Sequence, residues 1–222
     1  MERASRLLTI WAAFLALVVG QAPGQAQDAR SFSADIIERG QGGAAVPAGR
    51  LRVRAEKTRL ETPALPDGYF LADPTVPAAY FIRPAARLYM DARGSSRLTR
   101  LFVPVDSNDP CRTWQAMAEL ANAGTSGDWQ CAGAGEERLG DRRALVYRVR
   151  AGDQQQFIGW VDPQLRFPLQ ITLADGMTYI VEGIREEAQA VDLFELPPAL
   201  QKFDPAALLE RVRQSDVWVE TH

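Results

Sequence analysis

Apolar and polar residues alternate in short segments along most of this chain. In residues 49–59, Arg50, Arg52 and Arg54 alternate with apolar residues, which predicts a strand with the arginines on one face. Similar segments recur at a spacing of roughly 8–12 residues, separated by Pro, Asp or Gly: 31–39, 50–56, 57–62, 68–73, 78–84, 86–92, 100–105, 143–151, 155–162, 166–174 and 177–186. The pattern predicts a mainly β fold built on one large antiparallel sheet, with a hairpin turn at Asp175-Gly176.

Two segments have helical spacing instead. The first, predicted over 110–123, has Asp109 as N-cap and Pro110 at its first position, and Gly124 follows it. Its apolar stripe consists of Trp114, Met117, Ala118 and Ala121. The second, predicted over 205–214, repeats the Asp-Pro start. Its apolar residues, expected to face inward, are Leu208, Leu209 and Val212.

The stretch GWVDPQLRFPLQI, residues 159–171, is typical of strand, turn and strand. Asp162-Pro163 opens the turn, because proline presets its own φ and keeps the preceding residue out of the α region. Pro168 lies in the second strand and cannot donate to a sheet ladder, so it predicts an edge, a bulge or a break in pairing. The glycine-rich stretch 133–140 is predicted to be a loop.

The first 26 residues have the form of a secretory signal. Arg3 and Arg6 precede an apolar run over 7–20, and small residues stand where a cleavage site requires them, at 24–26. We expect cleavage after Ala26, leaving a single domain over 27–222 in a bacterial periplasm. The residue directly after the cleavage point is Gln27 and not a cysteine, so no lipid anchor is expected.

The chain contains two cysteines, Cys111 and Cys131. In an oxidising compartment such a pair usually forms a disulfide. The bridge is expected to hold helix 110–123 against the sheet. A metal-binding pair and two free thiols are the alternatives.

Charge is distributed unevenly along the chain. Residues 31–100 hold 11 basic and 7 acidic side chains, whereas residues 101–222 hold 11 basic and 19 acidic ones. The arginine face formed by Arg50, Arg52 and Arg54 is either a solvated outer face or a docking patch for an acidic partner or an anionic headgroup. An exported chain of net negative charge is not expected to bind nucleic acid.

Candidate catalytic groups are sparse. The only histidine is His222, so Ser-His triads and histidine metal sites have no carrier within the domain. The chain has no G-x-S-x-G, Walker or CxxC motif, and the glycines of 133–140 are misplaced for a dinucleotide site. Adjacent glutamates such as Glu136 and Glu137 point to opposite faces of a strand. We therefore expect a protein without catalytic activity, cofactor or metal, although an enzyme using Asp, Glu, Ser or Tyr remains the alternative.

Apolar and aromatic side chains are abundant on the predicted strands. Two short helices cannot cover the inner face of so large a sheet, so we expect it to curl and enclose a cavity. The candidate ligand-binding residues are Phe70, Phe81, Tyr89, Phe102, Trp114, Met117, Phe157, Trp160, Leu169 and Tyr179. Ordinary core packing is the alternative for each of them.

Residues 31–205 resemble the LolA-like superfamily of periplasmic proteins. The resemblance rests on a W-x-D-P-x-x-x-x-P-L pattern followed by an F-x-[LI]-P-x-x-[YL]-x-K pattern. The matching positions are Trp160, Asp162, Pro163, Pro168, Leu169, Phe194, Leu196, Pro197 and Lys202. The resemblance implies a strongly curved antiparallel sheet, an incomplete barrel with helices covering its open mouth, and it implies that Pro168 lies at the gap of that barrel.

The resemblance also implies two kinds of function. Some relatives bind lipids or the acyl chains of lipoproteins on the concave face, and others sense envelope stress by binding a protein partner. We therefore expect a periplasmic carrier of a hydrophobic ligand, with a lipid or an acylated protein as partner. An envelope protein-interaction module that docks through the arginine face is the alternative.

Overall fold

A single twelve-stranded sheet dominates the computed structural model, which describes residues 30–92, 96–121 and 128–214. The predicted signal and the cleavage point lie outside the described residues. The strands are β1 (Ser31–Arg39), β2 (Val46–Arg54), β3 (Lys57–Glu61), β4 (Tyr69–Asp73), β5 (Ala78–Arg83), β6 (Leu88–Asp91), β7 (Trp129–Leu139), β8 (Arg142–Ala151), β9 (Gln154–Asp162), β10 (Phe167–Leu173), β11 (Thr178–Glu186) and β12 (Gln201–Lys202). The α-helices are α1 (Leu98–Leu101), α2 (Pro110–Leu120) and α3 (Pro205–Gln214), and the 3-10 helices are η1 (Pro84–Ala86) and η2 (Val191–Phe194).

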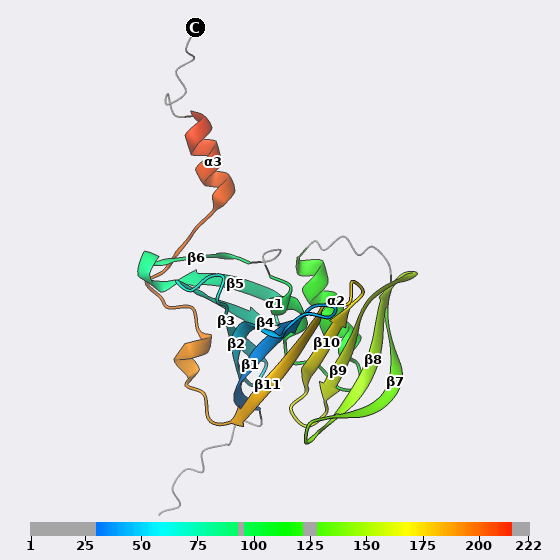
Figure 1. Ribbon diagram of the computed structural model, residues 1–222. Coiled ribbons are helices and arrows are strands. Elements are labelled where there is room, and N and C mark those ends of the chain that lie inside the picture. The colour runs from blue at the N-terminus through cyan, green and yellow to red at the C-terminus, as the bar shows by residue number, and fades with distance from the viewer. Residues whose placement is uncertain (1–29, 93–95, 122–127, 215–222) are drawn as a thin grey trace, which may run out of the picture.

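The strands follow the order β12-β6-β5-β4-β3-β2-β1-β11-β10-β9-β8-β7. Neighbouring strands are antiparallel except for the short parallel pair β12–β6. The sheet curves strongly without closing, and α1 and α2 lie in its concavity (Figure 1). This architecture confirms the predicted curved antiparallel sheet with helices in its mouth.

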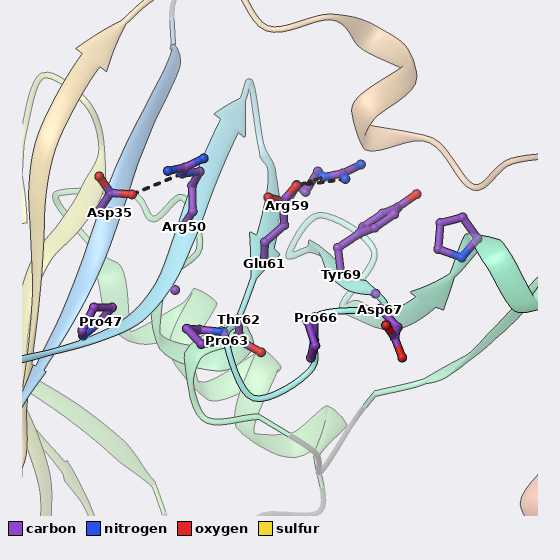
Figure 2. Close-up of a pocket in the computed structure, with 13 residues that line it drawn as sticks. Asp35, Pro47, Arg50, Arg59, Glu61, Thr62, Pro63, Pro66, Asp67 and Tyr69 are labelled. Atoms are coloured by element: carbon purple, nitrogen blue, oxygen red, sulfur yellow. Dashed lines mark hydrogen bonds and ion pairs between the residues drawn. The ribbon is translucent and has the colours of Figure 1, made fainter.

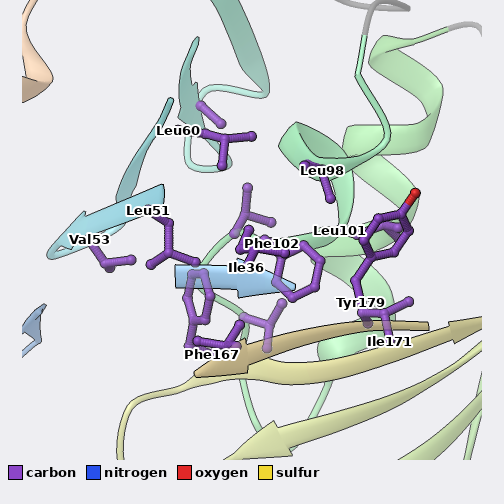
Figure 3. Close-up of a cluster of buried hydrophobic side chains, with 14 of the residues drawn as sticks. Ile36, Leu51, Val53, Leu60, Leu98, Leu101, Phe102, Phe167, Ile171 and Tyr179 are labelled. Carbon is purple, nitrogen blue, oxygen red and sulfur yellow. The ribbon is translucent and has the colours of Figure 1, made fainter. Parts of the chain in front are cut away.

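The main core fills the concavity. It combines inward side chains of the strands with residues of α1, α2 and the segment between them. Phe102 follows α1 and lies among Ile36, Leu51 and Phe167 of the sheet (Figure 3). Its ring centroid is 6.4 Å from that of Phe167. Burial alternates along β2 as the sequence predicts, with Leu51 and Val53 buried and the arginines between them on the outer face.

Pro168 lies at an irregularity in the interior of the sheet. The β9–β10 register shifts between Pro168 and Gln170, and the pairing of β10 with β11 begins only at Gln170. Proline thus occupies a position where β11 provides no partner, as expected for a residue without an N–H. Of the three predicted alternatives, the bulge is confirmed. Pro168 lies neither at an edge of the sheet nor at the gap of the incomplete barrel, because the two edge strands that border the gap are β7 and β12. The position at the gap that the resemblance implied is therefore wrong.

Two predicted elements are wrong. Residues 100–105 are not a strand: α1 ends at Leu101, and the following residues run through the core with Val103 and Val105 buried. Residues 133–140 are not a loop, because β7 runs to Leu139 and pairs with β8 around a register shift between Gly133 and Gly135. The φ of 108° at Gly135 is a left-handed value that favours glycine, which explains the glycine-rich sequence.

The two predicted helices form, with differences at their ends. α2 begins at Pro110 but ends at Leu120, and Gly124 lies outside the described residues. α3 extends away from the sheet (Figure 1), and its Leu208 and Leu209 are 42% and 59% exposed, so their predicted inward orientation is wrong. The side chain of Val212 lies outside the described part of the chain.

The predicted disulfide is confirmed. Cys111 in the first turn of α2 and Cys131 in β7 are joined, with a Cα–Cα distance of 5.6 Å. The bridge ties α2 to the edge of the sheet.

Candidate functional site

A pocket of about 400 Å³ lies between the two helices of the concavity and the nearby ends of the strands. We call it the helix–sheet pocket. Its wall consists of Arg97, Arg100, Leu101, Trp114, Ala118, Trp129, Gln156, Phe157, Leu173, Ala174 and Asp175. This volume lies within the range of sites that bind small molecules.

Three aromatic rings form the apolar floor of this pocket. Trp114 of α2 contacts Phe157 of β9 edge-to-face, with 5.0 Å between ring centroids, and Trp129 of β7 approaches the same Phe157 at 6.4 Å. The indole of Trp114 also donates a hydrogen bond from Nε1 to the carbonyl of Leu101, 3.1 Å away. The floor is therefore fixed by contacts among α1, α2 and the sheet.

Gly159 allows Trp114 to reach the sheet. A Cβ at position 159 would lie 2.8 Å from Cη2 of Trp114, closer than real Cβ contacts come. The side chains of Phe157 and Val161 point to the same face as this gap and are buried. The glycine is thus a packing requirement for seating α2.

The mouth of the pocket is polar and carries net positive charge. Arg97 pairs with Asp175 across the opening, with 3.6 Å between Nη1 and Oδ2. Arg100 is half-buried, and burial lowers its pKa, with the neighbouring charge of Arg97 lowering it further. No carboxylate of the described residues forms an ion pair with Arg100, so one positive charge at the mouth has no counter-ion within this part of the chain.

Two donors in the pocket wall have no acceptor. The Nε of Arg100 and the Nε1 of Trp129 are buried and form no hydrogen bond in the structure. Buried polar groups are normally satisfied, so two unsatisfied donors in one wall distinguish this pocket from ordinary core.

The structure brings only some of the predicted ligand-binding residues to this pocket. Trp114 and Phe157 line it. Six others are packed into the main core: Phe70, Phe81, Phe102, Met117, Leu169 and Tyr179. Tyr89 lies instead with Tyr80 beside a second cluster around Ile82, on the outer face. Trp160 alternates with the inward residues of β9 and donates its Nε1–H to Glu137 at 2.9 Å.

Sequence reasoning missed Arg97, Arg100, Trp129 and Leu173. Arg100 lay in a segment predicted to be a strand, and Trp129 begins a strand whose glycine-rich part was predicted to be a loop. The unpaired charge of Arg100 depends on which carboxylates the fold brings near it, and no local pattern reveals that.

A second hollow, of about 470 Å³, lies on the outer face over β1 to β4. Figure 2 shows two ion pairs among its charged side chains, and its remaining charged residue, Asp67, pairs with Arg83. Arg50 Nε lies 3.3 Å from Asp35 Oδ1, and Arg59 Nη2 lies 2.9 Å from Glu61 Oε1. Arg59 also stacks over the ring of Tyr69, 3.5 Å from its centroid.

The other two arginines of the predicted docking patch bind the chain itself. Residues 187–203, here called the strap, cross the outer face from β11 to β6 (Figure 1). Arg54 Nη1 donates to the carbonyl of Gln189 at 2.6 Å, and Arg52 Nη1 donates to Gln189 Oε1 at 3.1 Å. Phe194 of the strap is buried. Two arginines of this face thus hold the strap by hydrogen bonds. Of the three arginines, Arg50 is the most exposed, at 56%.

Within the described residues, no group of three or more His, Cys, Asp or Glu side chains could hold a metal ion. None of the described helices is long and apolar enough to cross a membrane.

No family model matches this chain, and no curated protein matches it. Some solved structures share general features. An uncharacterized conserved protein from Thermus thermophilus is 11% identical with a TM-score of 0.44, covering 80% of this chain and 91% of that one. PNGF-II is 6% identical with a TM-score of 0.48, covering 83% of this chain and 33% of that one.

MucB, in its complex with MucA(peri), is 15% identical with a TM-score of 0.38. The match covers 81% of this chain and 59% of MucB. The chain thus spans 59% of the length of MucB and 33% of the length of PNGF-II.

Proposed function

We propose that this protein is a non-catalytic periplasmic binder of a hydrophobic ligand, which it holds in the helix–sheet pocket. The observation that carries the proposal is the apolar floor formed by Trp114, Trp129 and Phe157 beneath a charged mouth. Such a floor gains dispersion contacts from an apolar ligand, whereas water in the same space finds few polar partners.

The test is a titration with a fluorescent fatty-acid probe at micromolar concentration. Leu173 lines the pocket and is only half-buried, so Leu173→Asp places a charge against the ligand without opening the main core. We expect this variant to bind the probe about tenfold more weakly, because burying a charge beside an apolar chain is unfavourable. Leu65→Asp is the matched control, since Leu65 is 42% exposed and lies outside the pocket.

Extraction of the protein purified from its own periplasm gives an independent readout. A lipid or acyl chain released by organic solvent would support the proposal. Absence of both a co-purifying lipid and probe uptake by the unmodified protein would overturn it.

Docking of an envelope protein through the arginine face receives less support. Arg52 and Arg54 already bind the strap, and Arg50 is paired with Asp35. Arg50→Glu is the clean test of such docking, because changes at the other two arginines would also release the strap.

A further inference from the structure

Arg100 is the unexplained feature of the helix–sheet pocket. It belongs to α1, is half-buried, and forms no ion pair with a carboxylate among the described residues. The positive charge of the neighbouring Arg97 repels that of Arg100, and Arg97 itself forms an ion pair with Asp175 at the mouth of the pocket. A half-buried guanidinium without a counter-ion is unfavourable unless something else supplies the negative charge.

Trp129 adds a second donor to the same wall. Its Nε1–H is buried without an acceptor, as is Nε–H of Arg100. Both side chains line the pocket, although Trp129 comes from β7 and Arg100 from α1. The wall of one pocket therefore carries unsatisfied donors from two separate elements.

We propose that the helix–sheet pocket selects an amphipathic anion, with an apolar chain on the aromatic floor and a carboxylate head bound by Arg100 and Trp129. This inference rests on the proposed function and narrows its ligand class. Guanidinium groups suit carboxylates because they offer parallel N–H donors to both oxygens. The two unsatisfied N–H groups are covered by protein atoms in the structure, so binding also requires the two side chains to rotate toward the head group.

The experiment compares ligands that share one chain and differ in the head group. Binding of dodecanoate, methyl dodecanoate, dodecyl phosphate and dodecylammonium is measured by displacement of the fluorescent probe. We expect dodecanoate to bind at least about tenfold more tightly than the neutral ester, as one charge-assisted hydrogen bond allows, and dodecylammonium to bind most weakly. Dodecyl phosphate distinguishes a carboxylate site from one for any anion: phosphate binding more tightly than carboxylate would overturn the choice of head group.

Substitutions then test which side chains produce the preference for a carboxylate head group. Arg100→Gln should remove the advantage of dodecanoate over its ester while leaving affinity for the ester within about threefold, since only a charged contact is lost. Trp129→Phe keeps an aromatic floor and loses the N–H, so it should weaken dodecanoate by a few-fold. Arg83→Gln is the matched control, because Arg83 is paired with Asp67 and lies outside the pocket. Thermal unfolding confirms that each variant is folded.

The possible failures are distinct. If the unmodified protein binds the ester as tightly as dodecanoate, the head-group inference is wrong and the proposed function stands. If it binds none of these ligands, both are wrong. Because this comparison uses the unmodified protein, it tests the preference for a carboxylate head group even if Arg100→Gln does not fold.

Discussion

At the scale of single residues, the contact between Gly159 and Trp114 controls how α2 sits on the sheet. Trp114 is 1% exposed and touches α1, Phe157 and the backbone at Gly159. The position of Trp114 on the apolar stripe of α2 suggests a charged substitution there as a test of ligand binding. Such a substitution would disrupt the core as well as the pocket. A substitution at Gly159 perturbs the same contact by a single added methyl group.

We expect Gly159→Ala to destabilise the protein by about 1–3 kcal/mol, because the added methyl group overpacks a tight contact. Urea unfolding measures the change, and Gly133→Ala on β7 is the control, since nothing lies within 4 Å of a Cβ there. Equal unfolding midpoints for the two variants would contradict the proposed seat for Trp114.

The carboxylate of Glu187 makes attachment of the strap sensitive to pH. The pKa of Glu187 is lowered, first by the hydrogen bond that Ser33 Oγ donates over 2.7 Å and then by Gln189. A lowered pKa in the folded state means that the stabilisation is complete above the unfolded value of about 4.3 and is lost as the pH falls through the folded value. We expect amide exchange in the strap, corrected for intrinsic rates, to increase below about pH 4.

Glu187→Gln should remove this acid-dependent opening. Glu182→Gln, at an exposed position on β11, should leave it unchanged. The interpretation fails if the two variants open alike as the pH is lowered.

At the scale of elements, the disulfide is the covalent link between α2 and the sheet. It closes a loop with a sequence separation of 20 residues. On the chain-entropy model, we expect the double variant Cys111→Ala and Cys131→Ala to lose about 3 kcal/mol of stability. Chemical unfolding of the oxidised protein, the reduced protein and the variant checks this, and identical midpoints for all three would contradict it.

The sequence predicted elements best where one face of a strand is buried. The alternation in β2 and the Asp-Pro start of α2 both correspond to what the structure shows. The glycine-rich part of β7 was not predicted as a strand because most residues of β7 are exposed and none is buried, so no buried face creates an alternation. The strand predicted over 100–105 is wrong for the opposite reason. These residues are apolar because they cross the core, and burial alone does not specify a strand.

At the scale of the whole molecule, the curvature could be predicted but the pocket could not. A sheet with so many apolar inward residues has to curve around something, and here most of that space is filled by α1, α2 and the segment around Phe102. The ten predicted ligand-binding residues therefore divide mainly between core and pocket. Trp129 and Arg100 line one pocket only because β7 and α1 border the same end of the concavity. Their shared position in the pocket wall is a property of the fold and has no local sequence signal.

The position of β1 in the sheet also determines the order in which the protein can fold. β1 is the first of the described strands, yet it lies between β2 and β11, with Ile36 opposite Val181. The N–H and C=O groups on one side of β1 therefore remain unpaired until β11 has been synthesised, when almost the entire chain is present. Contacts so distant in sequence form slowly, and a waiting strand edge is a template for pairing with other molecules. A chain interrupted before β11 should consequently aggregate rather than persist as a half-formed domain.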